Sequence, residues 1–285
     1  MRLKSLRNKS FKDILKAIDN YIGFARIGMI WYSNWFNPLA TFWLNFRSFP
    51  LSQAWRLPVA VYGHPRLFNL SGKMKVEGKI SFGMIAFNKT RPTSPSNMGV
   101  QSEILNQGLI IFHGRGVIGT GNKIRVAAKA VLDIGARFKI TDFVNIGCYT
   151  RIDIGEQSWV VHRCQLLDAN YHYIANFKKG IIPKWAKPIS IGKGCWICNS
   201  TTVTGGAVIP DFTIVASNSL VNKDFSNIEQ SSMIGGCPAK YLATGFRRVE
   251  NPNCEHAISQ FYFDNSDVIF HIPESMTPEK VSNYI

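Results

Sequence analysis

Aliphatic residues recur at every sixth position in the second half of the chain. One series runs through Ile191, Ile197, Val203, Ile209, Val215 and Val221. The same spacing occurs earlier in Ile118 and Ile124, in Ile134, Ile140, Ile146 and Ile152, and in Ile154, Val160 and Leu166. Four residues after the aliphatic position, the last hexads carry a small residue: Cys195, Thr201, Ala207, Thr213 and Ser219. The pattern indicates an internal repeat of six residues.

A six-residue period excludes stacked helices. On a helix of about 3.6 residues per turn, sixth residues are about 240 degrees apart, so an aliphatic series would spread around the helix. If each hexad is one short strand and a corner, three hexads close a triangular coil with the aliphatic residue inside and the small residue at the corner. Strands of successive coils then pair in parallel. We therefore predict an all-β solenoid.

The first 46 residues lack this repeat. A basic stretch at the N-terminus has apolar residues at helical spacing: Phe11, Ile14, Leu15 and Ile18. Residues 27–44 carry no charge, but polar residues and Pro38 interrupt them. Amphipathic aromatic residues that prefer an interface are frequent there: Trp31, Tyr32, Trp35, Phe36, Phe42 and Trp43. We expect a helical region that is either a membrane-surface anchor or a cap on the protein's own core, and we disfavour a membrane span.

The net charge of the chain indicates which classes of molecule it binds. The chain has 33 Lys and Arg residues against 18 Asp and Glu, a formal net charge of +15, which favours an anionic partner. The basic residues spread along the whole chain without a recognition motif, so we expect no nucleic acid. The basic N-terminus lacks a short apolar run that ends in a small-residue cleavage site. We therefore expect a cytoplasmic protein, peripheral on the inner membrane surface if the aromatic region binds there.

Two of the six cysteines form a C-x-x-C spacing in "GKGCWICNST". Cys195 takes the small corner position of one hexad and Cys198 belongs to the next, so their side chains need not converge. A lone C-x-x-C without a second pair or a histidine at zinc spacing is weak evidence for a metal or redox site. We expect reduced, buried thiols and no metal.

Several motifs resemble a known family: "VIGTGNKI", "VLDIGARFKI", "IDIGEQSWV", "DANYHYI", the run from "KPISIGKGCWICNS" to "SNSLVNKD", and "IGGCPAK". They are similar to hexapeptide-repeat acyltransferases, in particular O-acetyltransferases of bacterial capsule and lipopolysaccharide. The resemblance implies a left-handed parallel β-helix over residues 109–245. It also implies acetyl-CoA as donor, a sugar or polysaccharide acceptor, and a homotrimer with active sites between subunits. Residues 1–46 would be the helical region, 47–108 a connecting region and 246–285 a tail.

The resemblance assigns catalytic roles to particular residues. Acyl transfer to a sugar hydroxyl needs a base, and His172 lies where "YIANFKKGIIPKWAK" interrupts the hexads. The family's catalytic histidine stands at the start of such a loop, so His172 is the expected general base. Trp196 matches a pocket tryptophan and Asn145 an asparagine that contacts the acceptor, although a corner asparagine is as often structural. Asp168 would fix the His172 tautomer, unless it is a solvated loop residue.

Coenzyme A would bind along the late coils. The resemblance places it at Asn199, Ser217, Asn222, Lys223 and Lys240, where lysines suit the nucleotide phosphates. Surface lysines of a basic protein are, as the alternative, simply solvated. The chain departs from the family pattern at Cys198, Ala216 and Asn218, which replace glycines, and at Cys237, where asparagine or valine usually precedes Pro238. These changes leave acyl-chain size and cofactor affinity open.

Two other functions are known alternatives for a β-helix of this kind. A zinc carbonic anhydrase on this fold needs closely spaced histidine ligands, whereas His162 and His172 are ten residues apart and the others are remote. A non-catalytic, membrane-docked β-helix that binds glycans or proteins would have no use for a base beside a thioester groove. The histidine therefore favours the enzyme, and the binding module stays as the alternative.

Overall fold

The chain folds as a parallel β-helix with three sheets as its faces. This computed structural model describes residues 35–89, 100–265 and 268–283. Sheet I contains β1 (Val59–Val61), β4 (Ile85–Phe87), β7 (Gly116–Ile118), β10 (Phe138–Ile140), β13 (Trp159–Val160), β16 (Trp196–Ile197), β19 (Ile214–Val215), β21 (Ser232–Gly235) and β22 (Lys240–Thr244). Sheet II contains β2 (Arg66–Leu67), β5 (Glu103–Asn106), β8 (Lys123–Val126), β11 (Asn145–Cys148), β14 (Gln165–Leu167), β17 (Thr202–Thr204) and β20 (Leu220–Val221). Sheet III contains β3 (Lys73–Val76), β6 (Leu109–Phe112), β9 (Val131–Ile134), β12 (Arg151–Ile154), β15 (Ile189–Ile191) and β18 (Val208–Ile209).

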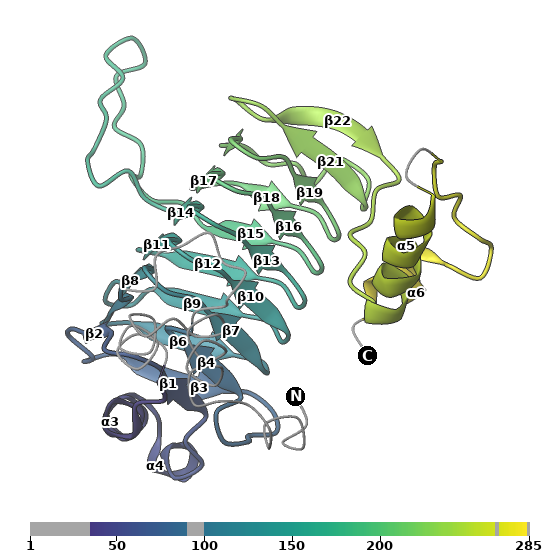
Figure 1. Cartoon of the computed structure of the whole chain (residues 1–285). Coiled ribbons are helices and arrows are strands. Elements are labelled where there is room, and N and C mark those ends of the chain that lie inside the picture. The colour runs from purple at the N-terminus through teal and green to yellow at the C-terminus, as the bar shows by residue number, and fades with distance from the viewer. Residues whose placement is uncertain (1–34, 90–99, 266–267, 284–285) are drawn as a thin grey trace, which may run out of the picture.

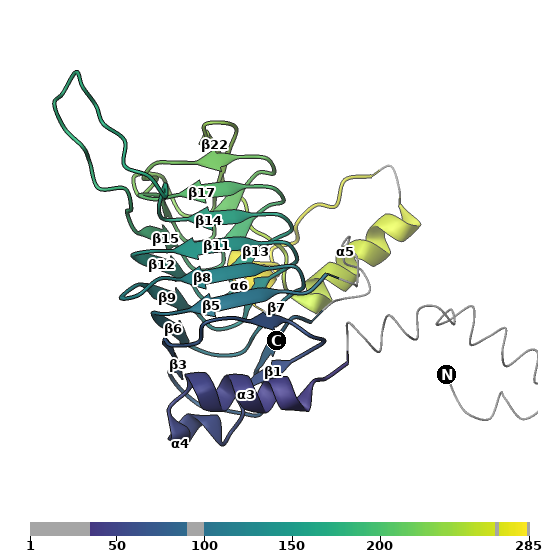
Figure 2. The ribbon, with the colours of Figure 1, turned by 90° about the vertical axis from the view of Figure 1, so that its left-hand side faces the viewer.

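The coils rise with a left-handed turn. Successive strands visit sheets I, II and III in order, and β1 lies at the bottom of Figure 1 with sheet II on the left. Figure 2 brings that left-hand side to the front and shows sheet III on its left and sheet I on its right. In Figure 1 the chain therefore climbs from the left across the back to the right. The predicted left-handed parallel β-helix is confirmed.

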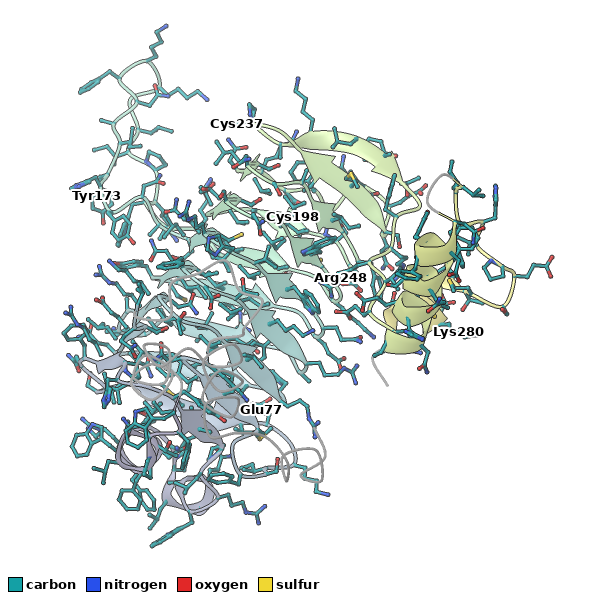
Figure 3. All side chains as sticks on the ribbon, viewed as in Figure 1. Glu77, Tyr173, Cys198, Cys237, Arg248 and Lys280 are labelled. Carbon is teal, nitrogen blue, oxygen red and sulfur yellow. The ribbon has the colours of Figure 1, made fainter. Side chains whose placement is uncertain are left out.

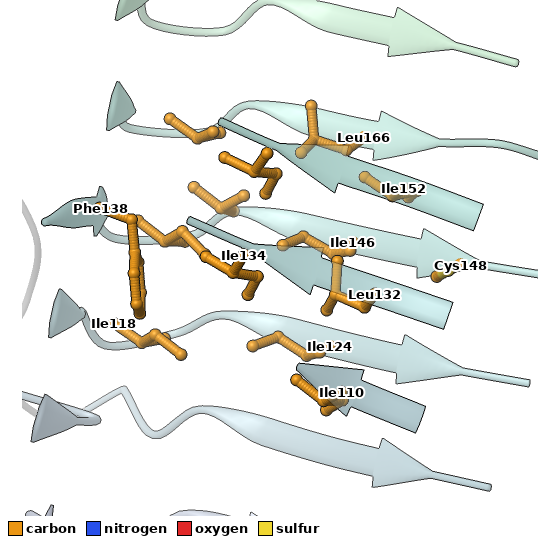
Figure 4. Close-up of a cluster of buried hydrophobic side chains, with 14 of the residues drawn as sticks. Ile110, Ile118, Ile124, Leu132, Ile134, Phe138, Ile146, Cys148, Ile152 and Leu166 are labelled. Carbon is orange, nitrogen blue, oxygen red and sulfur yellow. The ribbon is translucent and has the colours of Figure 1, made fainter. Parts of the chain in front are cut away.

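The six-residue aliphatic series form the interior of the helix. Every member named above is at most 3% exposed, and Figure 4 shows a group of them stacked between the sheets. Aliphatic residues of successive coils pair with one another, as Ile191 does with Ile209. Each buried aliphatic side chain stabilises the fold by roughly 1.5–3 kcal/mol. The small corner residues are buried as well, as the repeat predicts.

The coils begin earlier than the predicted boundary at residue 109. Strands β1 to β5 lie within the expected connecting region 47–108, and they pair in parallel with the later coils. The six-residue period does not reveal these coils because segments of other lengths separate their strands, such as residues 88–102 between β4 and β5. The β-helix therefore starts near Val59.

Helix α3 (Pro38–Ser48) closes the bottom of the first coil. Its buried Asn45 donates to the carbonyl of Val59 at 2.7 Å and accepts from the Val59 N–H at 3.1 Å. Thr41 Oγ1 accepts from the N–H of Val61 at 2.9 Å. Side chains of the helix thus satisfy the backbone groups of edge strand β1, which would otherwise be open to another strand. This part of the N-terminal region is a cap on the protein's own core.

The described residues contain three further helices: α4 (Leu51–Ala54), α5 (Pro252–Asp264) and α6 (Pro278–Ser282). The last two lie beside sheet I in Figures 1 and 2. Within the described ranges, no helix is long and apolar enough to cross a membrane. The helix expected around residues 11–18 lies outside the described residues.

Candidate functional site

An excursion between β14 and β15 interrupts the β-helix and is the strongest candidate for a site. Isolated bridges join Ala169 to Ala186 and Asn176 to Ile181, so its two halves run antiparallel away from the coils (Figures 1 and 2). His172 lies at the root of this excursion with an exposed side chain. A general base must reach both the proton and the reacting groups, and an exposed imidazole on a rigid scaffold is placed to do so.

Asp168 contacts the backbone of a neighbouring coil. It is fully buried, and its carboxylate accepts hydrogen bonds from the N–H groups of Tyr149, Thr150 and Arg151 and from Thr150 Oγ1, at 2.7–3.0 Å. The structure records no hydrogen bond between Asp168 and His172 among the described residues. The geometry therefore gives Asp168 a different task from the expected control of the His172 tautomer: it holds the corner at residues 149–151 against the excursion root.

Asn145 lies on the outer face of sheet II. It begins β11, is half-buried, and pairs with Lys123 in the coil below and Gln165 in the coil above. Two residues further on, Gly147 lies under the excursion, because a Cβ on this glycine would be only 2.9 Å from Tyr171 Oη. Asn145 thus shares a face with the root of the excursion, and its contact with an acceptor stays a prediction.

Trp196 lies on a different face from His172. It belongs to sheet I, where it pairs with Trp159. The Arg248 guanidinium carbon is 4.0 Å from the ring centroid of Trp159 and 6.0 Å from that of Trp196. The buried indole Nε1 of Trp196 has no hydrogen-bond partner in the described part of the chain. Because His172 stands at the corner between sheets II and III, a single chain does not bring the two predicted residues together.

The residues expected to bind coenzyme A are all exposed, at three places of the late coils. Asn199 and Ser217 occupy the corner between sheets I and II in successive coils. Asn222 and Lys223 follow β20, at the opposite end of sheet II. Lys240 begins β22 on sheet I. They do not form one cluster within a chain, and their roles stay predictions.

The C-x-x-C cysteines do not form a thiol pair. The buried Cys195 thiol donates to the carbonyl of Pro210 at 3.1 Å, whereas the half-buried Cys198 sulfur is 4.0 Å from the carbonyl of Trp196. Burial raises the pKa of Cys195 to about 12 and that of Cys198 to about 11. The expectation of buried thiols holds for four of the six cysteines and is wrong for Cys237, which is exposed.

Alkylation should separate these thiols. We expect iodoacetamide at about pH 8 to label Cys237 and to leave Cys148, Cys164 and Cys195 unlabelled in the folded chain. Burial raises the pKa of each of these three thiols to about 12. Because the thiolate is the reactive form, only about one molecule in ten thousand is reactive at each position. Peptide mass spectrometry with and without denaturant measures the pattern, and equal labelling of buried and exposed thiols in the folded chain would contradict it.

Sequence reasoning missed four aromatic side chains at the excursion root. The Tyr149 ring centroid is 5.2 Å from that of Tyr171 and 5.3 Å from that of Trp185, and the Tyr173 centroid is 6.3 Å from that of Trp185. We call these four residues the aromatic group. Two of its members flank His172 in "NYHYI", which is a signal that the sequence carries. The other two join them only through the fold.

The chain has relatives with named functions, although no protein-family model matches it. A protein of Escherichia coli strain K12 named as a lipopolysaccharide biosynthesis O-acetyl transferase, WbbJ, is 24% identical over 147 residues. The match covers 49% of this chain and 74% of the relative. An uncharacterized 24.8 kDa protein in the cps region of Klebsiella pneumoniae is 32% identical over 152 residues, which cover 50% of this chain and 64% of that protein. The resemblance inferred from the hexad motifs is thus confirmed in sequence.

Two solved structures are also similar to part of the chain. The acetyltransferase VCA0836 of Vibrio cholerae, in complex with acetyl-CoA, matches at 25% identity with a TM-score of 0.34 over 40% of this chain and 60% of its own. The polysialic acid-specific acetyltransferase NeuO matches at 17% identity with a TM-score of 0.35 over 69% of this chain and 92% of its own.

Proposed function

We propose that the chain is an acetyl-CoA-dependent O-acetyltransferase that acts on a sugar hydroxyl of a surface polysaccharide or its precursor. One observation carries the proposal: His172 stands exposed at the root of the excursion, in a chain similar in sequence to a named O-acetyl transferase. The rigid β-helix holds the imidazole, and the excursion leaves it open to the acceptor.

In this reaction His172 takes the proton of the acceptor hydroxyl while the oxygen attacks the thioester carbonyl carbon. The new C–O bond forms, the C–S bond breaks, and the imidazolium returns the proton to the coenzyme A sulfur. Asn145 would orient the acceptor and Trp196 would shape the pocket around the thioester. Exposed Lys223 and Lys240 would bind the phosphates of coenzyme A, which suits the chain's net charge of +15.

A homotrimer with sites between subunits fits the separation of these residues. His172 belongs to the corner between sheets II and III, and Trp196 belongs to sheet I. A site that uses both must therefore take one from each of two copies.

The decisive assay incubates the purified chain with acetyl-CoA and purified capsular or lipopolysaccharide glycans, and follows thiol release and product mass. Acetyl ester formation supports the proposal. Tight glycan binding with no turnover on any acceptor would favour the non-catalytic binding module instead.

We further propose that the N-terminal end of the β-helix rests on the inner membrane surface. Helix α3, helix α4 and the residue that follows α4 expose five large apolar side chains at 54–82%: Leu39, Phe42, Trp43, Leu51 and Trp55. Exposed Arg47 and Arg56 lie on the same two-helix unit, and such a combination suits anionic lipid headgroups.

The double variant Phe42→Glu/Trp43→Glu should lower binding to phosphatidylethanolamine–phosphatidylglycerol vesicles at least about tenfold, because two interfacial aromatic rings are lost and two negative charges are added. Co-sedimentation measures the bound fraction. Phe263→Glu is the matched control, since this 85% exposed ring lies on α5. Equal binding of the double variant and the wild type would refute the membrane contact.

A further inference from the structure

The aromatic group at the excursion root has open ring surfaces. Tyr173 is 70% exposed and Tyr171 is 45% exposed, while Tyr149 and Trp185 are half-buried. None of the four belongs to the buried hydrophobic core, and Tyr173 projects at the base of the excursion in Figure 3. Core packing therefore does not account for the group.

The rings meet at steep angles and do not stack face to face. The interplanar angle is 84° between Tyr149 and Tyr171, 62° between Tyr149 and Trp185, and 55° between Tyr173 and Trp185. Rings in edge contact hold one another in place without stacking face to face. An edge contact covers one face of one ring, so the faces that no edge covers, above all those of the exposed Tyr173, can receive another molecule.

The fold holds the group rigidly in place. Tyr149 stands on the corner between β11 and β12, whose N–H groups the buried Asp168 carboxylate binds. Tyr171 has a φ of 63°, a left-handed conformation that eleven other non-glycine residues of the described chain also adopt. Gly147 beneath it provides the space that a larger residue would take from the Tyr171 hydroxyl. The hydrogen bonds of Asp168 and the space over Gly147 thus fix where Tyr149 and Tyr171 stand.

We propose that the aromatic group is the acceptor subsite and stacks against the C–H face of a hexopyranose ring. The inference rests on the proposed function, because the acceptor hydroxyl must lie beside His172, and His172 stands between Tyr171 and Tyr173 in the chain. The C–H groups on one side of a pyranose ring carry partial positive charge, and the faces of aromatic rings are electron-rich. Tyrosine hydroxyls at the edges add hydrogen-bonding groups for the sugar hydroxyls, as in sites that combine apolar surface with few polar groups.

Saturation-transfer NMR with the full-length chain tests the subsite without acetyl-CoA. The probes are the methyl glycosides of glucose, galactose and N-acetylglucosamine, each titrated to saturation. We expect Trp185→Ala and Tyr173→Ala to weaken binding about five- to tenfold, because each removes one ring face. Trp185→Phe should keep binding within about twofold, since it retains an aromatic face.

Phe177→Ala is the matched control, because this ring is 93% exposed on the same excursion and contacts no other ring in the described residues. It should bind the glycosides as the wild type does. The inference is overturned if Trp185→Ala binds like the wild type, if Trp185→Phe is as weak as Trp185→Ala, or if the wild type binds none of the probes. His172→Ala should still bind them, so a failed base and a failed subsite give different results.

Discussion

Replacing His172 by alanine should lower kcat for acetyl transfer by about 10²- to 10⁴-fold, the usual contribution of a positioned general base. The KM for acetyl-CoA should change little, because in the proposed reaction the imidazole would act on the acceptor proton and not on the nucleotide. The side chain is exposed, so its removal leaves no cavity and the melting temperature should stay that of the wild type. Acceptor-dependent thiol release at varied acetyl-CoA concentrations measures both constants, and undiminished turnover would eliminate His172 as the base.

Mixed oligomers provide the control for a site built from two chains. Subunits with His172→Ala and subunits with Trp196→Ala should each be nearly inactive alone. After unfolding and joint refolding, some sites would pair an intact His172 with an intact Trp196, and part of the activity should return. No recovery in the mixture, with both variants folded, would contradict a shared site.

Glu250→Ala should reduce the free energy of unfolding by about 3–5 kcal/mol, the typical loss when one partner of a buried ion pair is removed. The Arg248 and Glu250 side chains are only 8% and 5% exposed and form an ion pair. Burial already lowers the pKa of Arg248 to about 10 and raises that of Glu250. Without the Glu250 carboxylate, the Arg248 guanidinium, which lies over the Trp159 ring, would be a buried charge with no counterion.

Two controls separate this effect from a general loss of charge. Glu77→Ala removes the ion pair with Lys75 on the surface (Figure 3), where the two side chains are 46% and 39% exposed, so stability should hardly change. The double variant Arg248→Met/Glu250→Leu should recover most of the loss because it removes both charges. Denaturant unfolding compares the three, and a Glu250→Ala protein as stable as Glu77→Ala would show that the pair contributes nothing.

The hexad period determined the central coils without any structure. A residue such as Ile197 has neighbours that the period itself specifies: the next inward residue along the coil and Val215 in the coil above. The same aliphatic position is buried in each hexad, so the sequence pattern alone predicts which side chains lie inside. The position of His172 followed for the same reason, because the excursion is visible as a break in the repeat.

Contacts between segments with no shared period were decided only by the tertiary structure. The first coil starts at Val59 and is closed by Asn45, and the C-terminal segment lays Arg248 against Trp159. Asp168 likewise binds a corner one coil away, which brings Tyr149 to the excursion. Each of these contacts depends on the face of the β-helix against which the segment packs. Burial and hydrogen bonding between residues far apart in the sequence select that face. The six-residue period specifies only the order of the strands within the stack of coils.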